Sequence, residues 1–344
     1  MKKLLLLFVA SLLMADRSAP YTSEGEQPIA SNEDYNLALQ PSWGSGDIPQ
    51  SAAPDVVGAF RFICTAGQVL ADDPIVYPGQ PGKSHLHQFY GNESADANST
   101  YASLRTTGQS TCNHGPFAAN RSAYWMPAML DVAGNPVKPD YVTIYYKRRP
   151  AGDPKCSLTS GDPRAEGNCV AIPNGLKFIF GYDMLSGKRP TGAGYFNCDG
   201  PTGVQGHYAN LPQALEKCPA GNRIGAIIMA PECWDGKNLD SPNHRDHVAY
   251  PGYGDWGYLR CPATHPYVIP TFTLGAWYQL TAGMHLSSDA MVPNAAPGTT
   301  FHADYFEAWD PIVKAMWTDN CINKMLNCSG GDLGNGMQLK GAAI

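Results

Sequence analysis

The sequence has no apolar run long enough to cross a membrane as a helix. Its longest early run, Leu4–Ala15, is shorter than the roughly 20 residues that a transmembrane helix needs. No Cys-x-x-Cys, Gly-x-Ser-x-Gly or Walker-type loop occurs, so a thiolate zinc site, a serine hydrolase elbow and a phosphate-binding loop are not expected. Acidic residues outnumber basic ones by 30 to 24, and this balance disfavours binding of nucleic acid.

The first residues are typical of an export signal. A short basic head, Met1-Lys2-Lys3, precedes the apolar run, so residues 1–15 are predicted to form a secretory signal peptide. We therefore expect a protein that is secreted to the cell exterior, or to the periplasm if the host is a bacterium. Residues 16–54 are rich in Ser, Pro, Asn, Gly and Ala and are expected to form a low-complexity leader or linker, and residues 329–344 a flexible Gly-rich tail.

The ten cysteines are an even number, which favours disulfides in an exported protein. Cys156 with Cys169, and Cys321 with Cys328, are close enough in sequence to form local disulfides, whereas the other pairings cannot be assigned from the sequence. Four Asn-x-Ser/Thr sequons could carry glycans in a eukaryotic host, which would make the chain a glycoprotein. They begin at Asn92, Asn98, Asn120 and Asn327.

Residues 55–328 are predicted to form a single β-rich domain. Short apolar runs are separated by turn sequences such as Asn174-Gly175 and Asp199-Gly200. Many short strands joined by long loops favour a mainly β fold, a β-sandwich or jelly-roll-like domain with few short helices. The expected strands span Val57–Cys64, Tyr124–Leu130, Val142–Tyr146, Leu176–Phe180, Arg223–Met229, Tyr267–Leu274 and Trp277–Ala282.

One helix is predicted near the C-terminus of this domain, beginning at Asp310-Pro311 and ending near Leu326. Asp can cap the first turn of a helix, and Pro fits the first helical position because its missing N–H needs no partner there. The residues of this helix that we expect to face the core are Ile312, Ala315, Met316 and Cys321.

The most informative motif is Ser84-His85-Leu86-His87. Residues i and i+2 of an extended strand point to the same face, so His85 and His87 would present two imidazoles side by side. Such a pair suits metal binding, proton transfer or hydrogen bonds to a polar substrate. Two strand histidines that serve only the structure are an equally open alternative.

Two further segments place a histidine near another polar side chain. His244 and His247 would lie together on a helical turn, although the segment could also be a hydrogen-bonded loop. In His302-Ala303-Asp304 the carboxylate could hold the ring in one tautomer or raise its basicity, or it could cap a turn. The sequence thus predicts a site to which several distant segments each contribute a histidine.

A series of short motifs extends from Val57 to Cys321. It includes Asp73-Pro74-Ile75-Val76, Ser84-His85-Leu86-His87, Ser122-Ala123-Tyr124-Trp125, Cys233-Trp234-Asp235-Gly236-Lys237, Asp246-His247-Val248-Ala249-Tyr250-Pro251 and His302-Ala303-Asp304. In this order the series resembles the secreted family DUF1996, a domain of unknown function of fungi and bacteria that is sometimes fused to carbohydrate-binding or cell-wall modules. The resemblance implies secretion and a link to glycans or cell walls, and it implies no particular activity.

The leading hypothesis is a secreted enzyme that cleaves a polysaccharide, by hydrolysis or β-elimination, in a histidine-lined cleft. A glutamate pair for glycoside hydrolysis is poorly supported at Glu232 and Glu307, whereas a pair of aspartates stays possible. The expected catalytic residues are His85, His87, His247, His302 and Asp304. The expected substrate contacts are Arg105, Tyr124, Trp125 and His244.

Two alternatives stay open beside this hypothesis. The chain could be a non-catalytic module that binds glycans or cell walls, with histidines that serve only the structure. It could instead hold a divalent metal at His85, His87 and His247, and no other cofactor is expected. In each case the expected partner is a polysaccharide or cell-wall glycan, the expected state is a monomer, and neither nucleic acid nor a membrane span is expected.

Overall fold

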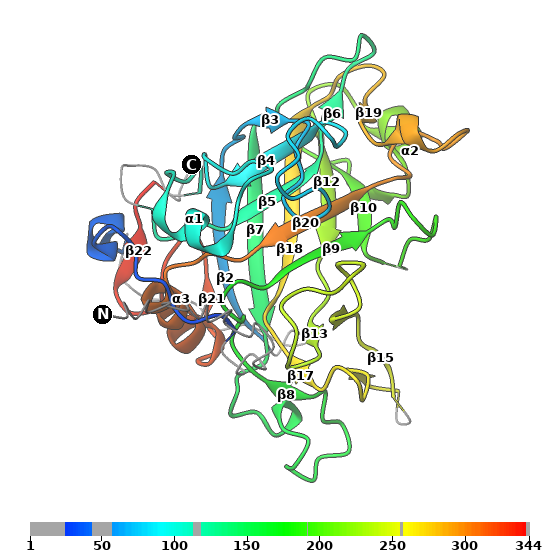
Figure 1. The fold of residues 1–344 in the computed structure, drawn as a ribbon. Coiled ribbons are helices and arrows are strands. Elements are labelled where there is room, and N and C mark those ends of the chain that lie inside the picture. The colour runs from blue at the N-terminus through cyan, green and yellow to red at the C-terminus, as the bar shows by residue number, and fades with distance from the viewer. Residues whose placement is uncertain (1–24, 43–56, 113–117, 191, 255–256, 342–344) are drawn as a thin grey trace, which may run out of the picture.

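The computed structural model describes residues 25–42, 57–112, 118–190, 192–254 and 257–341. The expected signal peptide, residues 1–15, and part of the expected leader lie outside these ranges. Two mainly antiparallel sheets lie one behind the other, and long loops and short helices surround them (Figure 1). The fold is mainly β, as the sequence predicts, and is consistent with a β-sandwich-like single domain.

The larger sheet has seven strands in the order β11-β10-β12-β18-β7-β2-β21. Neighbouring strands are antiparallel except β2 and β21, which are parallel. Its central strands are rich in aromatic and β-branched residues, which pack well on a pleated surface. The strands are β11 (Gly206–Tyr208), β10 (Gly194–Asp199), β12 (Arg223–Met229), β18 (Thr271–Gln279), β7 (Tyr141–Arg148), β2 (Gly58–Cys64) and β21 (Asn327–Cys328).

The smaller sheet has five strands in the order β3-β4-β5-β20-β9, all antiparallel. Strands β4, β5 and β20 are buried along their whole length, so both faces of this sheet are covered. The strands are β3 (Val69–Leu70), β4 (His87–Gly91), β5 (Ala123–Pro127), β20 (His302–Phe306) and β9 (Lys177–Gly181).

Short elements surround the two sheets. The four-stranded group β14-β13-β17-β8 and three two-stranded pairs, β1 with β22, β15 with β16 and β6 with β19, lie at the periphery. The additional strands are β1 (Leu39–Pro41), β6 (Met129–Leu130), β8 (Asn168–Cys169), β13 (Cys233–Trp234), β14 (Val248–Ala249), β15 (Gly252–Tyr253), β16 (Leu259–Arg260), β17 (Tyr267–Val268), β19 (His285–Leu286) and β22 (Met337–Leu339). The α-helices are α1 (Tyr101–Thr106), α2 (Leu211–Lys217) and α3 (Pro311–Trp317), and the other helical turns are η1 (Tyr35–Ala38), η2 (Pro154–Cys156), η3 (Asp289–Met291) and η4 (Thr318–Ile322).

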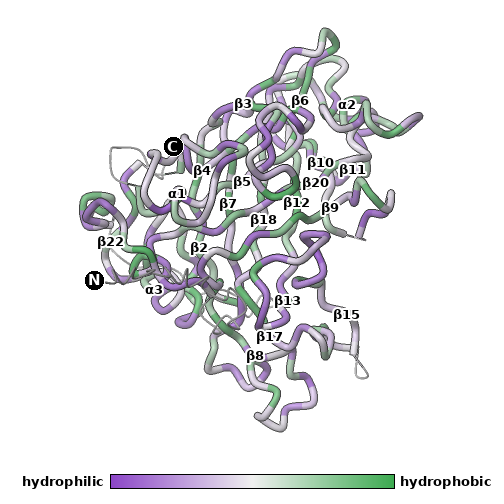
Figure 2. The backbone as a smooth tube through the Cα atoms, viewed as in Figure 1, coloured by the Kyte–Doolittle hydropathy of each residue, from purple (hydrophilic) through white to green (hydrophobic). Residues whose placement is uncertain are grey.

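The main core lies between the two sheets. Tyr124 and Tyr305 of the smaller sheet meet Phe272 of the larger sheet, with ring centroids 5.8 Å and 4.8 Å from it. Hydrophobic residues recur along the central strands, whereas many peripheral loop residues are hydrophilic (Figure 2). The inward-facing residues of β4, β5 and β20 therefore alternate with residues that point to the outer face of the smaller sheet.

The outer face of the smaller sheet carries a second apolar cluster. Phe89 stacks on Trp125 at a centroid distance of 5.3 Å, and Phe306 joins them. Tyr101 and Leu104 of α1 cover this cluster. Side chains alternate along a strand, so residues an even number of positions apart point to the same face. His87, two positions before Phe89, and His302, four positions before Phe306, therefore also belong to the outer face.

Most of the predicted strands are confirmed, with one change of boundaries. The two strands expected over Tyr267–Leu274 and Trp277–Ala282 are instead a short β17 and one continuous strand β18, Thr271–Gln279. Strands β4, β10 and β20 were not among the expected strands. The sequence of β20, His-Ala-Asp-Tyr-Phe, does not resemble a buried strand, because it includes a histidine and an aspartate. Both of these polar residues are nevertheless buried.

The predicted helix forms, and Cys321 and Met316 pack into or against the core as expected, whereas Ile312 and Ala315 are exposed. Asp310 caps it by accepting hydrogen bonds from the N–H groups of Ile312 and Val313, and the helix continues as a π-helical turn to Ile322. Ile312 is 49% exposed, whereas Lys314 and Trp317 are buried. The helix is rotated in this way because Trp317 stacks on Phe60 of β2 and Lys314 pairs with a buried glutamate.

Parts of the expected leader and tail are structured. Residues 25–42 include β1, which pairs with β22 in the expected Gly-rich tail, so that Leu39 lies opposite Leu339. Both leucines are buried. Glu33 also forms an ion pair of 2.9 Å with Arg121. The composition of these two segments predicted a flexible leader and a flexible tail. Pairing of β1 with β22 and burial of their few apolar side chains instead hold both segments against the domain.

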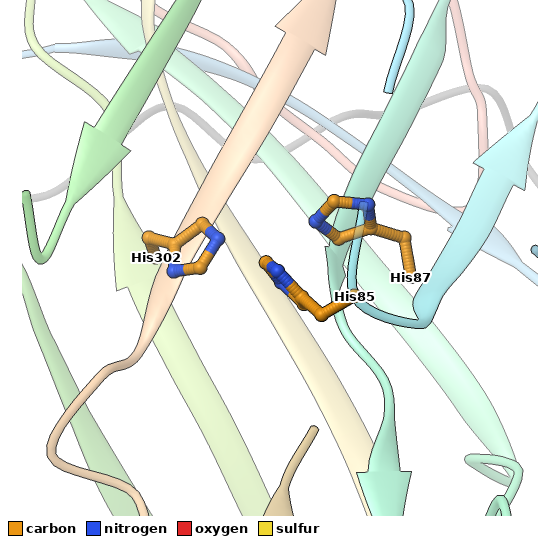
Figure 3. Close-up of side chains that lie close together, drawn as sticks. All are labelled: His85, His87 and His302. Carbon is orange, nitrogen blue, oxygen red and sulfur yellow. The ribbon is translucent and has the colours of Figure 1, made fainter. Parts of the chain in front are cut away.

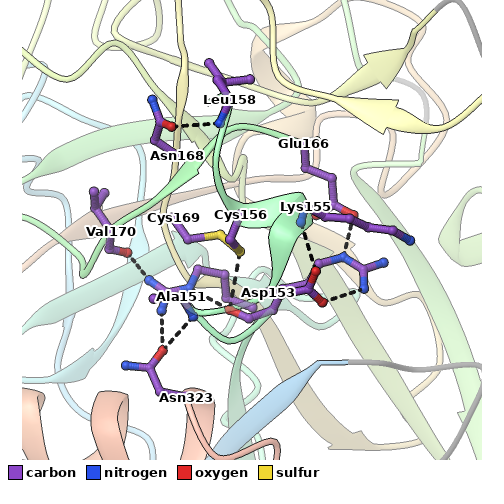
Figure 4. Close-up of a disulfide and its surroundings, with 12 residues drawn as sticks. Ala151, Asp153, Lys155, Cys156, Leu158, Glu166, Asn168, Cys169, Val170 and Asn323 are labelled. Carbon is purple, nitrogen blue, oxygen red and sulfur yellow. Dashed lines mark hydrogen bonds and ion pairs between the residues drawn. A yellow bond between two sulfur atoms is a disulfide. The ribbon is translucent and has the colours of Figure 1, made fainter. Parts of the chain in front are cut away.

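All ten cysteines form disulfides, and the two local pairs expected from the sequence are confirmed. Figure 4 shows the pair Cys156–Cys169, where η2 and β8 are also held by the bond from the Leu158 N–H to the Asn168 side chain. The five pairs are Cys64–Cys112, Cys156–Cys169, Cys198–Cys218, Cys233–Cys261 and Cys321–Cys328.

Replacing both Cys156 and Cys169 by serine is expected to lower the free energy of unfolding by about 2–3 kcal/mol. The disulfide closes a loop with a sequence separation of 13, and a loop of about that length constrains the unfolded chain by roughly this amount. Urea denaturation of the double variant and the unchanged protein measures the difference. A change below about 0.5 kcal/mol would contradict a stabilising role, since that is the usual effect of a neutral surface substitution.

Two of the four sequons cannot carry a glycan in the folded protein. Asn92 is buried and donates to the carbonyls of Leu104 and Thr107, and Asn120 is buried and donates to the Tyr124 hydroxyl. The other two, at Asn98 and Asn327, are exposed, so the expectation of glycosylation is limited to them. Within the described ranges, no helix is both long enough and apolar enough to cross a bilayer.

Candidate functional site

Three histidines converge on the outer face of the smaller sheet. His87 begins β4, His85 lies two residues before it, and His302 begins β20 (Figure 3). In the strand register His87 pairs with Pro127 of β5, and Asp304 pairs with Trp125, so His302 comes close to the level of Pro127 as well. The two histidines therefore lean toward each other across the intervening strand, with His85 between them.

The three rings are in contact distance of one another. The centroid of His85 lies 4.2 Å from that of His87 and 5.2 Å from that of His302, and the remaining pair is 6.1 Å apart. One ligand nitrogen from each ring can be chosen so that all three lie within 4.8 Å of one another. A metal with bonds of about 2.1 Å needs these nitrogens about 3.4 Å apart, so binding of a metal would draw the rings closer together.

Hydrogen bonds from the main chain fix the tautomers of two of these histidines. The Nδ1 of His87 lies 2.9 Å from the Asp72 carbonyl oxygen, and the Nδ1 of His302 lies 2.8 Å from that of Thr300. A carbonyl oxygen only accepts, so each Nδ1 carries the proton and each Nε2 keeps its lone pair. This is the arrangement that orients histidine ligands in metal sites.

The ligand nitrogens have no protein partner. The Nε2 atoms of His85 and His87 are buried and form no hydrogen bond within the described part of the chain. A buried polar atom without a partner costs about 1–3 kcal/mol, so such atoms are uncommon unless a ligand, ion or water satisfies them. Two unsatisfied nitrogens that face a third imidazole are free to accept a hydrogen bond from a ligand or water, or to bind a metal ion.

Burial keeps all three imidazoles neutral. The pKa of His85 is lowered to about 2, and the pKa values of His87 and His302 are lowered to about 3. Burial is the largest cause of each shift, and a neighbouring imidazole contributes to each because it disfavours additional positive charge. A neutral imidazole is the form that binds a metal. The three rings are therefore ready to act as ligands at any physiological pH.

The loop before β4 is held in place by two adjacent aspartates. The Asp72 carboxylate accepts hydrogen bonds from the N–H groups of Gly82 and Ala97, while its carbonyl accepts the bond from His87. The Asp73 carboxylate accepts the N–H groups of Ile75 and Val76. These bonds fix the loop conformation that brings His85 against the other two rings.

A second network positions His302. Asp289 accepts a 2.7 Å hydrogen bond from the Thr300 hydroxyl, which also lies 2.6 Å from the Ser288 hydroxyl. The same carboxylate accepts the Gly298 N–H. Because the Thr300 carbonyl holds the His302 ring, Asp289 acts through Thr300 as a positioning residue for the site.

An open cavity of about 360 Å³ leads to the three histidines. His85 and His302 line it, and His87 lies behind them with no exposed surface. This volume is within the roughly 300–1,000 Å³ of small-molecule sites. The other polar side chains that line it are Asp73, Lys83, Ser84, Asp183, Asn243, His244, Arg245 and Asp304.

Two carboxyl groups in this cavity have raised pKa values. Burial raises the pKa of Asp304 well above its ordinary value, and Asp73 raises it further. Burial also raises the pKa of Asp73 itself. Both Asp304 oxygens are buried and lack a hydrogen-bond partner within the described residues. Burial thus favours the protonated form of Asp304, whose carboxyl group lines the same cavity as His85 and His302.

His247, one of the expected catalytic and metal residues, does not join the site. Its Nε2 donates to the Lys177 carbonyl at 2.9 Å, and its Nδ1 accepts from the Ser241 hydroxyl at 2.9 Å. Both ring nitrogens are therefore occupied, and the ring holds the 240–247 loop against β9. The three histidines that the structure brings together are therefore His85, His87 and His302, and His247 is not among them.

His244, expected to contact substrate, does line the cavity. It adopts φ of 58°, and its Nδ1 lies 2.8 Å from the Asp240 carboxylate, which also pairs with Lys177. The predicted meeting of His244 and His247 on one helical turn is wrong, because the segment is a hydrogen-bonded loop.

The other expected substrate contacts are buried away from the cavity. Arg105 has no exposed surface and pairs with Asp310 at 3.1 Å. The Tyr124 hydroxyl lies 2.7 Å from that of Tyr146 in the main core, and Trp125 stacks on Phe89 under α1. None of the three lines the cavity: Tyr124 and Trp125 are buried because β5 is covered on both faces, and Arg105 is buried on α1 by its ion pair with Asp310.

Neither of the two glutamates considered for glycoside hydrolysis lines the cavity. Glu307 is buried in an ion pair of 2.8 Å with Lys314. Glu232 lies next to the Cys233–Cys261 disulfide, where burial and the nearby Glu166 raise its pKa to about 7. The carboxyl groups of the site are instead those of Asp73 and Asp304.

The raised pKa of Glu232 predicts a pH-dependent loss of stability that Glu232→Gln removes. The folded protein keeps the proton up to about pH 7, whereas the unfolded chain loses it near 4.5, so the contribution present below pH 4.5 is lost as the pH rises to about 7. A pKa difference of one between the folded and unfolded states corresponds to about 1.4 kcal/mol. With an allowance for the partial exposure of Glu232, the free energy of unfolding is expected to fall by about 2 kcal/mol between low and neutral pH. Urea denaturation at pH 5 and pH 8 measures the free energy of unfolding of the unchanged protein and of Glu232→Gln. The same change between the two pH values in both proteins would contradict the prediction.

The donor set identifies the class of metal. Three neutral imidazoles suit zinc or copper, whereas calcium and magnesium need oxygen ligands. Three protein ligands would leave a coordination position for water or substrate, as in catalytic zinc sites, and His85 and His302 line the cavity from which either would enter.

Several residues of the site could not be predicted from the sequence. Arg245 and Asp183 line the cavity, and Asp289 supports it from behind, yet none belongs to a metal-binding or catalytic spacing. Asp73 stands in one of the short motifs, but the motif alone assigned it no particular role. Only the fold shows that the loops before β4, after β9 and before β14 meet at one place.

Comparison with known proteins assigns a family. The family model described as a domain of unknown function, DUF1996, matches residues 73–309. These residues include all three histidines and the three aspartates that line the cavity, Asp73, Asp183 and Asp304. Neither the curated proteins nor the solved structures contain a significant match to the chain.

Proposed function

The chain belongs to the DUF1996 family, and we propose that this member is a metal-dependent enzyme of the cell exterior whose metal is held by His85, His87 and His302. The observation that carries the proposal is the convergence of three neutral imidazoles, two of which have a buried Nε2 without a partner. Zinc or copper is the metal class that this donor set favours.

The bound metal would act as a Lewis acid at the floor of the cavity and would lower the pKa of a coordinated water. Asp304 is two residues from His302 on the same face of β20 and would hold a proton at its carboxyl for transfer to a leaving oxygen. His244 and Arg245 would orient a polar substrate from the opposite loop. These roles assign one acid, one metal and two binding groups to a single cavity.

A polysaccharide or cell-wall glycan is the proposed substrate. Five disulfides and the predicted signal peptide favour a location outside the cell, where glycans are abundant polymers. The cavity combines apolar side chains, such as Met184 and Leu185, with a few charged groups. That mixture suits a sugar ring, which has both apolar faces and polar edges.

A second candidate function is hydrolysis by Asp73 and Asp304 without a metal. Both carboxyl groups line the cavity, and the charge of one raises the pKa of the other, as in paired-carboxylate enzymes. This alternative gives no role to the convergence of the three imidazoles or to the unpartnered Nε2 atoms of His85 and His87. We therefore place it second.

Metal analysis combined with an activity screen tests the proposed function. Purified protein is dialysed mildly, its zinc and copper contents are measured, and it is incubated with uronic-acid polymers and neutral glucans while product absorbance and reducing ends are followed. We expect about one metal ion per chain and a cleavage activity that chelation abolishes and metal restores. Stoichiometric metal with no cleavage would leave only a binding role, and cleavage that resists chelation would favour the two aspartates.

A further inference from the structure

A second cavity adjoins the one that leads to the histidines. It has a volume of about 450 Å³ and lies between the loop after β9 and the segment around β14. The two cavities share three wall residues, Ile179, Asp183 and Arg245. A ligand longer than one sugar unit could therefore occupy both cavities at once.

Arg245 stands at the boundary with most of its donors free. Its guanidinium donates to the carbonyls of Gly181 at 3.3 Å and Tyr182 at 3.0 Å, and these bonds fix its position. No carboxylate of the described chain lies within ion-pair distance of it. A guanidinium has five N–H donors, so three remain for a ligand. The position of the Arg245 guanidinium is thus fixed while three of its N–H groups stay available. This arrangement suits binding of an anionic group through two parallel hydrogen bonds.

The second cavity has an excess of positive side chains. Lys188 and Arg189 line it together with Arg245, against Asp183 and Asp246. Arg189 donates to the main-chain carbonyls of Ala209 and Gly194, and the described chain offers neither it nor Lys188 an ion-pair partner. Asp183 and Asp304 attract Arg245 over a longer distance, but the three cations still outnumber the two carboxylates that line this cavity, and this excess favours an anionic ligand over a neutral glycan.

We propose that the second cavity is a subsite for an anionic sugar unit, a uronate or a sulfated sugar, whose charged group binds Arg245 while the neighbouring unit of the same chain lies at the three histidines. This inference rests on the proposed function, and it names the substrate class as an acidic polysaccharide. Arg245, Arg189 and Lys188 hold the anionic unit, so they determine specificity and do not take part in the chemical step.

Binding to matched oligosaccharides tests this subsite. Calorimetry on the full chain uses tetramers of galacturonate, of a sulfated galactan and of neutral galactan, each with and without zinc. We expect one acidic tetramer to bind at least about 10-fold more tightly than the neutral one, since a hydrogen bond to a charged group contributes a factor of about this size. The carboxylated and sulfated tetramers distinguish the two sources of negative charge. Equal affinity for acidic and neutral tetramers, or no binding of either acidic tetramer, would overturn the proposal.

Two variants locate the effect. Arg245→Gln removes the central cation and is expected to weaken acidic binding about 10-fold or more. Because Arg245 also supports the main chain of β9, Lys188→Gln serves as a second variant at an exposed side chain, with a smaller loss that disappears at high salt. Lys217→Gln, at an exposed lysine of α2, is the matched control and should bind as the unchanged protein does. Unchanged acidic binding in both cavity variants would overturn the subsite.

Metal content measured in the same samples separates the two proposals. Acidic binding that depends on Arg245 in a protein without stoichiometric metal would leave the subsite standing and reject the metal centre. Stoichiometric metal with no preference for acidic tetramers would reject the subsite alone.

Discussion

Replacing His302 by alanine is expected to weaken zinc binding by at least about 100-fold. The substitution removes one of three protein ligands, and loss of an outer partner of a ligand already costs about 10–100-fold in metal affinity. His87→Ala should have the same effect, because His87 lies at the back of the site where no water from the cavity can replace it. Competition with a chromophoric chelator measures the affinity in each variant.

The matched control for His302 is His247, which the sequence alone had placed among the ligands. Both of its ring nitrogens already bond to Ser241 and Lys177, so His247→Gln should keep the zinc affinity of the unchanged protein within about 3-fold, an effect below 1 kcal/mol. A circular dichroism spectrum checks that each variant is folded. Loss of zinc on replacing His247, with retention on replacing His302, would reverse the assignment.

Removing the charge of Glu307 is expected to destabilise the protein by about 3–5 kcal/mol. Glu307 has no exposed side-chain surface, and Lys314, its partner at 2.8 Å, is 6% exposed. The same carboxylate accepts the N–H groups of Gly175 and Trp309. Glu307→Gln leaves a buried ammonium group without its counter-charge, and that loss accounts for the expected magnitude. Urea denaturation gives the difference in free energy of unfolding.

An exposed ion pair provides the control for this prediction. Glu216 and Lys217 are also 2.8 Å apart, but more than half of each side chain is exposed. Glu216→Gln should therefore change the free energy of unfolding by less than about 1 kcal/mol. If both substitutions have similar small effects, burial of the Glu307 pair does not determine the stability of α3 against β20.

The sequence predicted the class of fold because strand and turn signals are local. Strand β12 was predicted with its observed boundaries, and Asp310-Pro311 marked the start of α3. The orientation of α3 could not be predicted in the same way. Burying Lys314 is favourable only beside Glu307, and the pairing of these two side chains depends on how α3 packs on the sheets.

The candidate site was predictable in part for the same reason. The His-x-His spacing placed His85 and His87 together, and the i, i+2 spacing of His302 and Asp304 placed both on one face of a strand. Which other histidine would meet the pair depended on the order β4-β5-β20, which brings His302 across one strand. His247 had an equally suggestive spacing, but its ring nitrogens are taken up by the loop that carries it.

Anomalous diffraction from crystals grown with zinc, recorded on both sides of the zinc absorption edge, tests the central claim most directly. We expect one strong peak about 2.1 Å from a nitrogen of each of His85, His87 and His302, with an open position toward Asp304 and the cavity. A peak at any other group of side chains, or none in crystals that contain zinc, would contradict a metal centre at these three histidines.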